Sequence, residues 1–325
     1  MKHRVIWIDW AKTIFIYLMV VGHCFPIAWE NQLIYAFHMP AFFIISGYLY
    51  KPHHWIKTLK SFGVPILFFS TINFIIYAIP KIVKRSLDTS HLAERMILPF
   101  WGPGPEDWDY IILFPGVWFI IALFMCRLFM GDIKIFAPIR EHKYISLTIL
   151  LGFLIAEPYI LPHNLLQDYK FYRVIPSLPF VLLGYSMKDW FKIEDLKIWT
   201  IPFLVGCFIL MSFFNGYGNI LNYKFGISYG IFFITALFGS IALYSLCSKL
   251  PTNHFIVIIS SGTMMILAMN FNLKILINFI FTKLGFPQLT TDQYIFPWII
   301  SLLIVVICYY PIQYLIKHAP VLLGK

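Results

Sequence analysis

Long apolar stretches, interrupted only by short polar segments, constrain this chain more than any other feature of its sequence. The stretch "IISLLIVVICYYPI" at residues 299–312 is one example. Backbone groups in lipid must be hydrogen-bonded within the protein, so only helices and closed barrels span a bilayer, and these runs exceed barrel strands. We therefore expect an all-α polytopic integral membrane protein, a bundle of about ten transmembrane helices forming one domain over residues 1–325.

Composition agrees with a lipid environment. The chain is 60% hydrophobic and 12% charged, which is too little charge to cover a soluble surface. Its net charge of +10 comes from scattered Lys and Arg, typical of topology signals, so we expect the lipid bilayer and no nucleic acid as a partner. The cysteines lie inside apolar runs without metal-like spacing, so no metal site is predicted. The expected helices lie at about 5–27, 33–50, 61–80, 111–130, 144–162, 174–190, 198–214, 226–247, 256–273 and 297–316.

Positive charge predicts the orientation of these helices. With the N-terminus inside, 14 Lys and Arg fall in inner segments and 9 in outer ones, so both termini are expected to be cytoplasmic. The longest outer segment, 81–110, contains "FWGPGPEDWDY", whose Pro, Gly and Trp predict an ordered lid at the membrane surface. Its aromatic rings either stack on a sugar or form an interfacial belt.

The first helix, "VIWIDWAKTIFIYLMVVGHCF", carries ionisable residues in an apolar setting. Lys12 and His23 lie within roughly 20° of one helix face and about 16 Å apart along the axis. Asp9 precedes Lys12 by three residues, so the two can pair. This face suits a path through the membrane. The alternative is a snorkelling Lys12 and an interfacial His23.

Further polar residues follow in the next two helices. His38 enters from the outer side, at a depth similar to His23, with either a catalytic or a hydrogen-bonding role. "SGY", which contains Ser46 and Tyr48, either supports a site or permits close helix packing. Lys57 and Lys60 are one helical turn apart, a spacing that either presents two cations to phosphate groups or marks a positive-inside loop.

The stretches "WIDWAKTIFIYLMVVGH" and "FHMPAFFIISGYLY" together resemble the membrane-bound acyltransferase 3 family, and most closely its fucose 4-O-acetylase-like branch. Weaker similarity follows in "FGVPILFF", in "VWFIIALF" with Trp118, in "RVIPSLPFVLLGY" with Arg173, and in "SSGTMMILAMNF" with Asn270. The similarity spans most of the chain, although only residues 4–50 match specifically.

The resemblance implies an O-acetyltransferase of a bacterial inner membrane, which moves acetyl from cytoplasmic acetyl-CoA to a glycan or lipid-linked sugar acceptor of the cell envelope. It implies His23 as the catalytic histidine, with Lys12, Lys57 and Lys60 binding the donor. Both lysines of the pair stand where many members have Arg, which keeps charge but loses bidentate contact with phosphate.

The resemblance also implies supporting roles toward substrate or structure. These belong to Asp9, His38, Ser46, Tyr48, Trp118, Arg173 and Asn270. Asn270 stands where several members carry a late histidine.

Two mechanisms remain open for His23. A neutral imidazole can act as general base on the acceptor hydroxyl, or take the acetyl group itself and relay it. Two other classes of function also remain. A proton-coupled carrier would use the same polar face, although no internal repeat supports it. A noncatalytic scaffold leaves the shared face of Lys12 and His23 unexplained.

Overall fold

A computed structural model describes residues 5–83, 116–133, 138–139, 142–160, 170–190, 192–286 and 292–325. Most of these residues are helical. The longer helices are α1 (Ile6–His23), α2 (Ala28–Tyr48), α3 (Trp55–Val83), α5 (Val117–Arg127), α7 (Lys143–Ile160), α8 (Val174–Trp190), α9 (Thr200–Asn215), α10 (Tyr229–Ser248), α11 (His254–Ser261), α12 (Thr263–Lys283), α13 (Phe296–Ile307) and α14 (Tyr309–His318).

Short elements complete the described part of the chain. They are the π-helical turn η2 (Leu128–Asp132), the 3-10 turns η4 (Lys170–Arg173), η5 (Ile193–Asp195) and η7 (Pro320–Leu323), and the strands β1 (Gly218–Asn219) and β2 (Lys224–Phe225). The two strands form an antiparallel hairpin between α9 and α10, in which Gly218 faces Phe225.

Each of the ten predicted ranges contains a helix, so the expected all-α membrane fold is confirmed. Five helical stretches are long and apolar enough to cross a membrane: Ile6–His23, Trp55–Val83, Tyr229–Ser248, Thr263–Lys283 and Phe296–His318. The predicted lid in 81–110 falls almost wholly outside the described residues.

Two predicted ranges are wrong because each is divided into two helices in the structure, and α2 and α3 each begin at least five residues earlier than predicted. The range 256–273 is divided at Gly262 into α11 and α12, and α12 continues to Lys283. A Cβ placed on Gly262 would lie 2.4 Å from side-chain atoms of Ile312, so the close approach of α14 explains the glycine at this junction. The range 297–316 is divided at Cys308 into α13 and α14.

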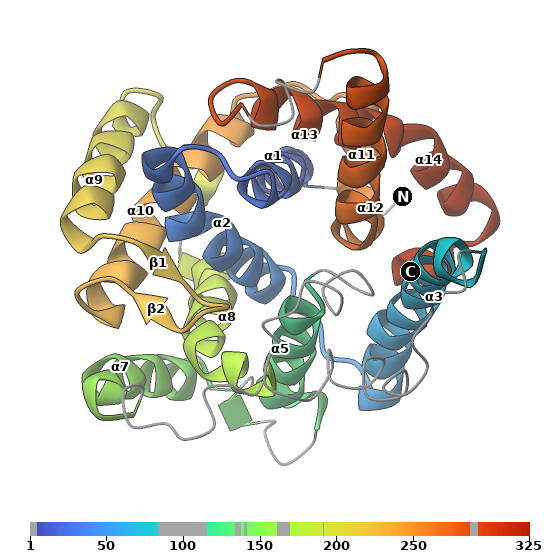
Figure 1. Ribbon diagram of the computed structural model, residues 1–325. Helices are drawn as coiled ribbons and strands as arrows, with labels where there is room; N and C mark the ends of the chain where they lie inside the picture. The colour runs from blue at the N-terminus through green and yellow to red at the C-terminus, as the bar shows by residue number, and fades with distance from the viewer. Residues whose placement is uncertain are drawn as a thin grey trace.

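Helix α1 occupies the interior of the molecule. It packs against α2, α10, α11, α12 and α13, and Figure 1 shows α1 and α2 between the α9–α10 side and the α11–α13 side. An interior helix can carry ionisable side chains because the surrounding protein, and not lipid, contacts them.

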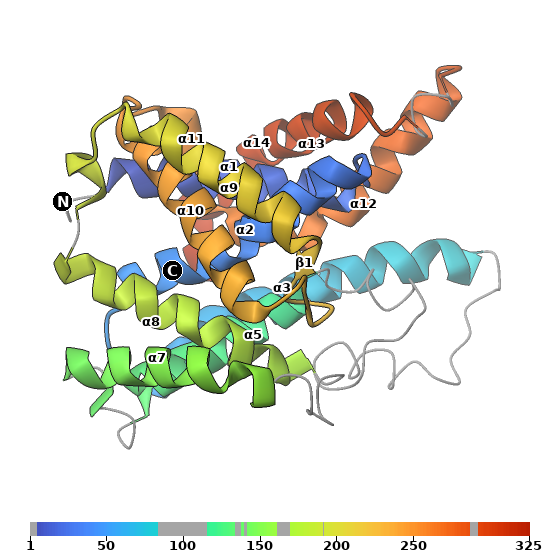
Figure 2. The ribbon, with the colours of Figure 1, turned by 90° about the vertical axis from the view of Figure 1, so that its left-hand side faces the viewer.

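The start of α1 and the C-terminus lie toward the same side of the molecule in Figure 2, and the β1–β2 hairpin lies at the end of α9 that is farther from that side. The C-terminal segment reaches the beginning of α3, where a Cβ on Gly324 would lie 2.5 Å from the carbonyl oxygen of Ser61. The loop between α2 and α3 is therefore on the side of the C-terminus.

The backbones of helices α2 and α8 are in direct contact at two glycines. A Cβ placed on Gly47 would lie 2.0 Å from the carbonyl oxygen of Val181, and one on Gly184 would lie 1.9 Å from that of Ile44. Small residues allow this packing, which drives helix association in membranes. Gly47 of the "SGY" motif thus has a packing role.

Candidate active site

A cavity of about 240 Å³ lies between α1, α2, α3, α5 and α12. Its lining is mainly aliphatic, aromatic and methionine side chains, and its polar lining residues are Lys12, Ser46, Arg127 and Thr263. Two of these four are cations, and the described lining contains no acidic residue. The cavity therefore suits an occupant with an anionic end and an uncharged body.

The cavity follows the face of α1 that the sequence predicts. Lys12, Ile16 and Met19 of α1 line it, and the same helical stripe reaches His23 one turn later. On α12, Leu267 lines the cavity, and Asn270 follows it at the next turn. His23 and Asn270 thus stand beyond the end of the cavity opposite Lys12.

His23 is held by Asn270. Its Nδ1 lies 3.0 Å from the Asn270 Oδ1, and the Asn270 Nδ2 donates to the carbonyl oxygens of Leu267 at 2.6 Å and Ile266 at 3.3 Å. These two contacts fix the amide orientation, so an oxygen that only accepts faces the ring. Nδ1 then carries the proton, and Nε2 keeps a lone pair for a reacting group.

Lys274 is a residue near His23 that the sequence analysis did not assign to the site. Its ammonium donates to the His23 carbonyl oxygen at 2.8 Å and lies 4.3 Å from the centre of the Phe25 ring. Lys274 lies one residue beyond the predicted range 256–273, so it counts among the nine Lys and Arg of the predicted outer segments. Its spacing of four residues from Asn270 is the signal that would have put both on one helix face.

His38 is buried, with 2% of its surface exposed. Its Nδ1 donates to the Ile34 carbonyl oxygen at 2.6 Å, which leaves Nε2 as the acceptor. The Tyr35 ring packs edge-on at 5.0 Å between ring centres.

Asp9 connects α1 to α11. It is buried and accepts a hydrogen bond from the Ser260 hydroxyl. Thr13, one turn later, donates to the Ile256 carbonyl oxygen at 3.2 Å. The carboxylate therefore helps to hold α1 against α11. Asp9 is not among the described residues that line the cavity, so its role is a supporting one.

Lys57 and Lys60 lie exposed in the first turns of α3, and neither lines the cavity. Ser46 lines it, whereas Tyr48 packs edge-on against Trp7 at 5.3 Å. Trp118 is buried beside Phe119 and is not among the described lining residues. The structure thus brings Lys12 and Ser46 to the cavity and leaves the lysine pair at the surface.

Arg173 lies away from the cavity. Its Nε and Nη2 donate to the Leu221 carbonyl oxygen at 2.9 and 2.7 Å, and its guanidinium lies 5.1 Å from the centre of the Tyr223 ring. Burial raises the pKa of the Tyr223 hydroxyl, and the charge of Arg173 opposes this rise. Arg173 therefore anchors the hairpin between α9 and α10 to the start of α8.

The fold and site together define an integral membrane protein with an ionisable centre in its interior, the arrangement of proteins that do chemistry or transport within the bilayer. The family model described as an acyltransferase domain matches residues 5–312, so the chain belongs to the membrane-bound acyltransferase 3 family. No curated protein and no solved structure matches the chain. Family membership favours acyl transfer over the carrier and scaffold interpretations.

Proposed function

We propose that this acyltransferase moves an acetyl group from acetyl-CoA to a hydroxyl of a surface or exported glycan, or of its lipid-linked precursor. One observation carries the proposal: a single cavity extends from two cations, Lys12 and Arg127, to the helical turn before His23. A phosphorylated donor with a long uncharged arm and a reactive end matches both ends of this cavity.

The size of the cavity supports an extended arm inside it. Its volume of about 240 Å³ is below the roughly 300–1,000 Å³ of sites that enclose whole drug-sized ligands. The nucleotide part of coenzyme A would then remain outside, with its phosphates at the cations. The pantetheine arm would follow the face of α1 over the roughly 16 Å between Lys12 and His23.

The hydrogen bonding of His23 supports a general-base mechanism. Its Nε2 takes the proton of the acceptor hydroxyl while that oxygen attacks the thioester carbonyl carbon. Collapse of the tetrahedral adduct breaks the carbon–sulfur bond, and the imidazolium returns its proton to the departing thiolate. The products are an O-acetyl ester and coenzyme A, with His23 unchanged.

An acyl-His23 relay would use the same Nε2 lone pair as nucleophile. Direct attack requires no acyl-imidazole within the membrane, and we favour it for that reason. Donor supplied without acceptor distinguishes the two mechanisms, because only the relay acetylates the protein. Mass spectrometry of the isolated His23 peptide would detect that acetyl group.

The decisive experiment replaces His23 by Ala in the purified full-length protein. We expect transfer of acetyl to acceptor to be lost, while acetyl-CoA still raises the melting temperature as it does for the parent. His318→Ala, a change at an exposed histidine of α14, is the matched control and should transfer normally. Transfer by folded His23→Ala near the parental rate would refute the role of His23.

We place the cavity mouth in the cytoplasm of a bacterial cell, with both termini on that side of the inner membrane. The 14-to-9 distribution of Lys and Arg supports this orientation, and the start of α1 lies on the same side as the C-terminus. A cysteine introduced at position 57, in a variant without native cysteines, should react with a membrane-impermeant maleimide only after the cells are opened. Labelling in intact cells would reverse the orientation.

A further inference from the structure

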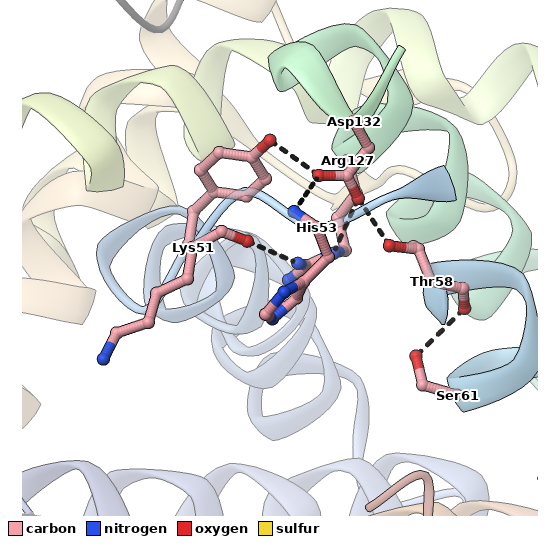
Figure 3. Close-up of polar contacts among 7 residues, drawn as sticks. Lys51, His53, Thr58, Ser61, Arg127 and Asp132 are labelled. Carbon is pink, nitrogen blue, oxygen red and sulfur yellow. Dashed lines mark hydrogen bonds and ion pairs between the residues drawn. The ribbon is translucent and has the colours of Figure 1, made fainter. Parts of the chain in front are cut away.

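Asp132 forms a buried polar cluster beside the cavity. Its side chain is 0% exposed. Oδ1 accepts hydrogen bonds from the Tyr50 hydroxyl at 2.8 Å and from the His53 backbone N–H at 3.1 Å, and Oδ2 accepts from the Thr58 hydroxyl at 2.5 Å. Figure 3 shows these groups converging on the carboxylate. A buried carboxylate needs such partners to offset its desolvation.

The chain turns sharply to bring this carboxylate back toward α5. Arg127 is the last residue of α5, and the π-helical turn that follows contains Gly131 with φ of 109°. Glycine adopts this left-handed conformation without the steric cost of a Cβ. The Asp132 Oδ2 consequently lies 3.7 Å from the Arg127 Nε.

Three contacts orient the Arg127 guanidinium, and its two polar contacts are made by Nε and Nη2. Besides the ion pair of its Nε, its Nη2 donates to the Lys51 carbonyl oxygen at 3.1 Å, and the group lies 5.1 Å from the centre of the Tyr50 ring. Figure 3 shows that Lys51 joins through its carbonyl while its side chain extends away. Among the described residues, Nη1 has no hydrogen-bond partner, and Arg127 lines the cavity.

We propose that Arg127, oriented by Asp132, binds a phosphate group of the acyl donor at the cavity mouth, an inference that rests on the proposed function. A guanidinium presents paired N–H donors that match phosphate oxygens. Asp132 touches no ligand in this scheme and is a positioning residue. The same carboxylate holds the loop between α2 and α3, so the position of this loop and the donor site are coupled.

The test compares two probes on the purified full-length protein: coenzyme A, and pantetheine, which lacks the phosphates. Arg127→Met keeps the apolar stem and removes the charge. We expect its affinity for coenzyme A to fall about ten- to a hundredfold, as for loss of a charge-assisted hydrogen bond, with unchanged affinity for pantetheine. Asp132→Asn should cause a smaller loss in the same direction. Lys317→Met, which removes an exposed cation on α14, should change neither affinity.

A purely structural Arg127 would weaken both probes equally or neither, and either result would overturn the inference. Arginine modification by phenylglyoxal adds a measurement on the parent protein, which does not depend on how a variant folds. Coenzyme A should protect Arg127 from modification and pantetheine should not, and equal modification with both probes would also overturn it. A parent protein that binds no coenzyme A would instead refute the proposed donor itself.

Discussion

Replacing Asn270 by Leu tests whether this amide sets the tautomer of His23. Leucine has nearly the same size but cannot accept the hydrogen bond from the His23 Nδ1, which spans 3.0 Å in the native protein. A neutral hydrogen bond contributes about 1 kcal/mol net, so its loss shifts the ratio of the two tautomers about fivefold toward Nε2–H. Because the base needs an unprotonated Nε2, we expect kcat to fall by up to about fivefold, with an unchanged KM for acetyl-CoA.

The tautomer is measured directly by ¹⁵N NMR of histidine-labelled protein at alkaline pH, where a protonated and an unprotonated ring nitrogen give well-separated signals. The His23 signals are assigned by their absence from His23→Gln. Asn272→Leu is the matched control, because Asn272 lies on the same helix and its amide donates to the Asn73 Oδ1 at 2.8 Å. The reasoning is refuted if the parent shows Nε2–H, or if Asn270→Leu leaves the tautomer unchanged.

Three further predictions concern charges outside the cavity. The double change Lys57→Ala and Lys60→Ala should weaken coenzyme A binding only a few-fold at low salt and less at high salt, because both lysines are exposed; unchanged affinity at low salt in a titration would count against them. Arg173→Met should lower the free energy of unfolding by about 2 kcal/mol through loss of the bonds to Leu221, measured by denaturation, while transfer per folded molecule persists. Backbone N–H groups at the start of α13 lower the pKa of Asp292. The ionised carboxylate therefore stabilises the folded protein fully above the usual carboxyl pKa, and this stabilisation is lost as pH falls through the lowered pKa. The difference in melting temperature from Asp292→Asn should therefore vanish in acid.

Helical periodicity predicted one side of the site well. The shared face of Lys12 and His23 follows from 3.6 residues per turn within a single helix, and the cavity lies along that face. Run length likewise predicted where helices lie, but it did not predict that 256–273 and 297–316 are each divided into two helices.

The partners of this face could not be predicted from local spacing. Asn270 is 247 residues from His23 in sequence, and lipid and protein interiors are equally apolar, so hydropathy does not reveal which side of α12 turns inward. Arg127 was missed for a similar reason, since its neighbours Tyr50 and Lys51 belong to a distant loop. Lys57 and Lys60 are expected to bind the donor because of the family resemblance, since their spacing alone fits a positive-inside loop equally well; this stays a prediction although the pair does not line the cavity.

The glycine contact between α2 and α8 limits the motion of these two helices relative to each other. Carbonyl oxygens of each helix occupy the space where the other would carry a Cβ, so neither helix can rotate about its axis without a backbone clash. The wall that α2 supplies to the cavity is thereby made stationary with α8. We therefore expect any widening of the cavity to leave the α2–α8 pair unchanged and to involve its other walls, among them α3 and α5 beside the loop held by Asp132.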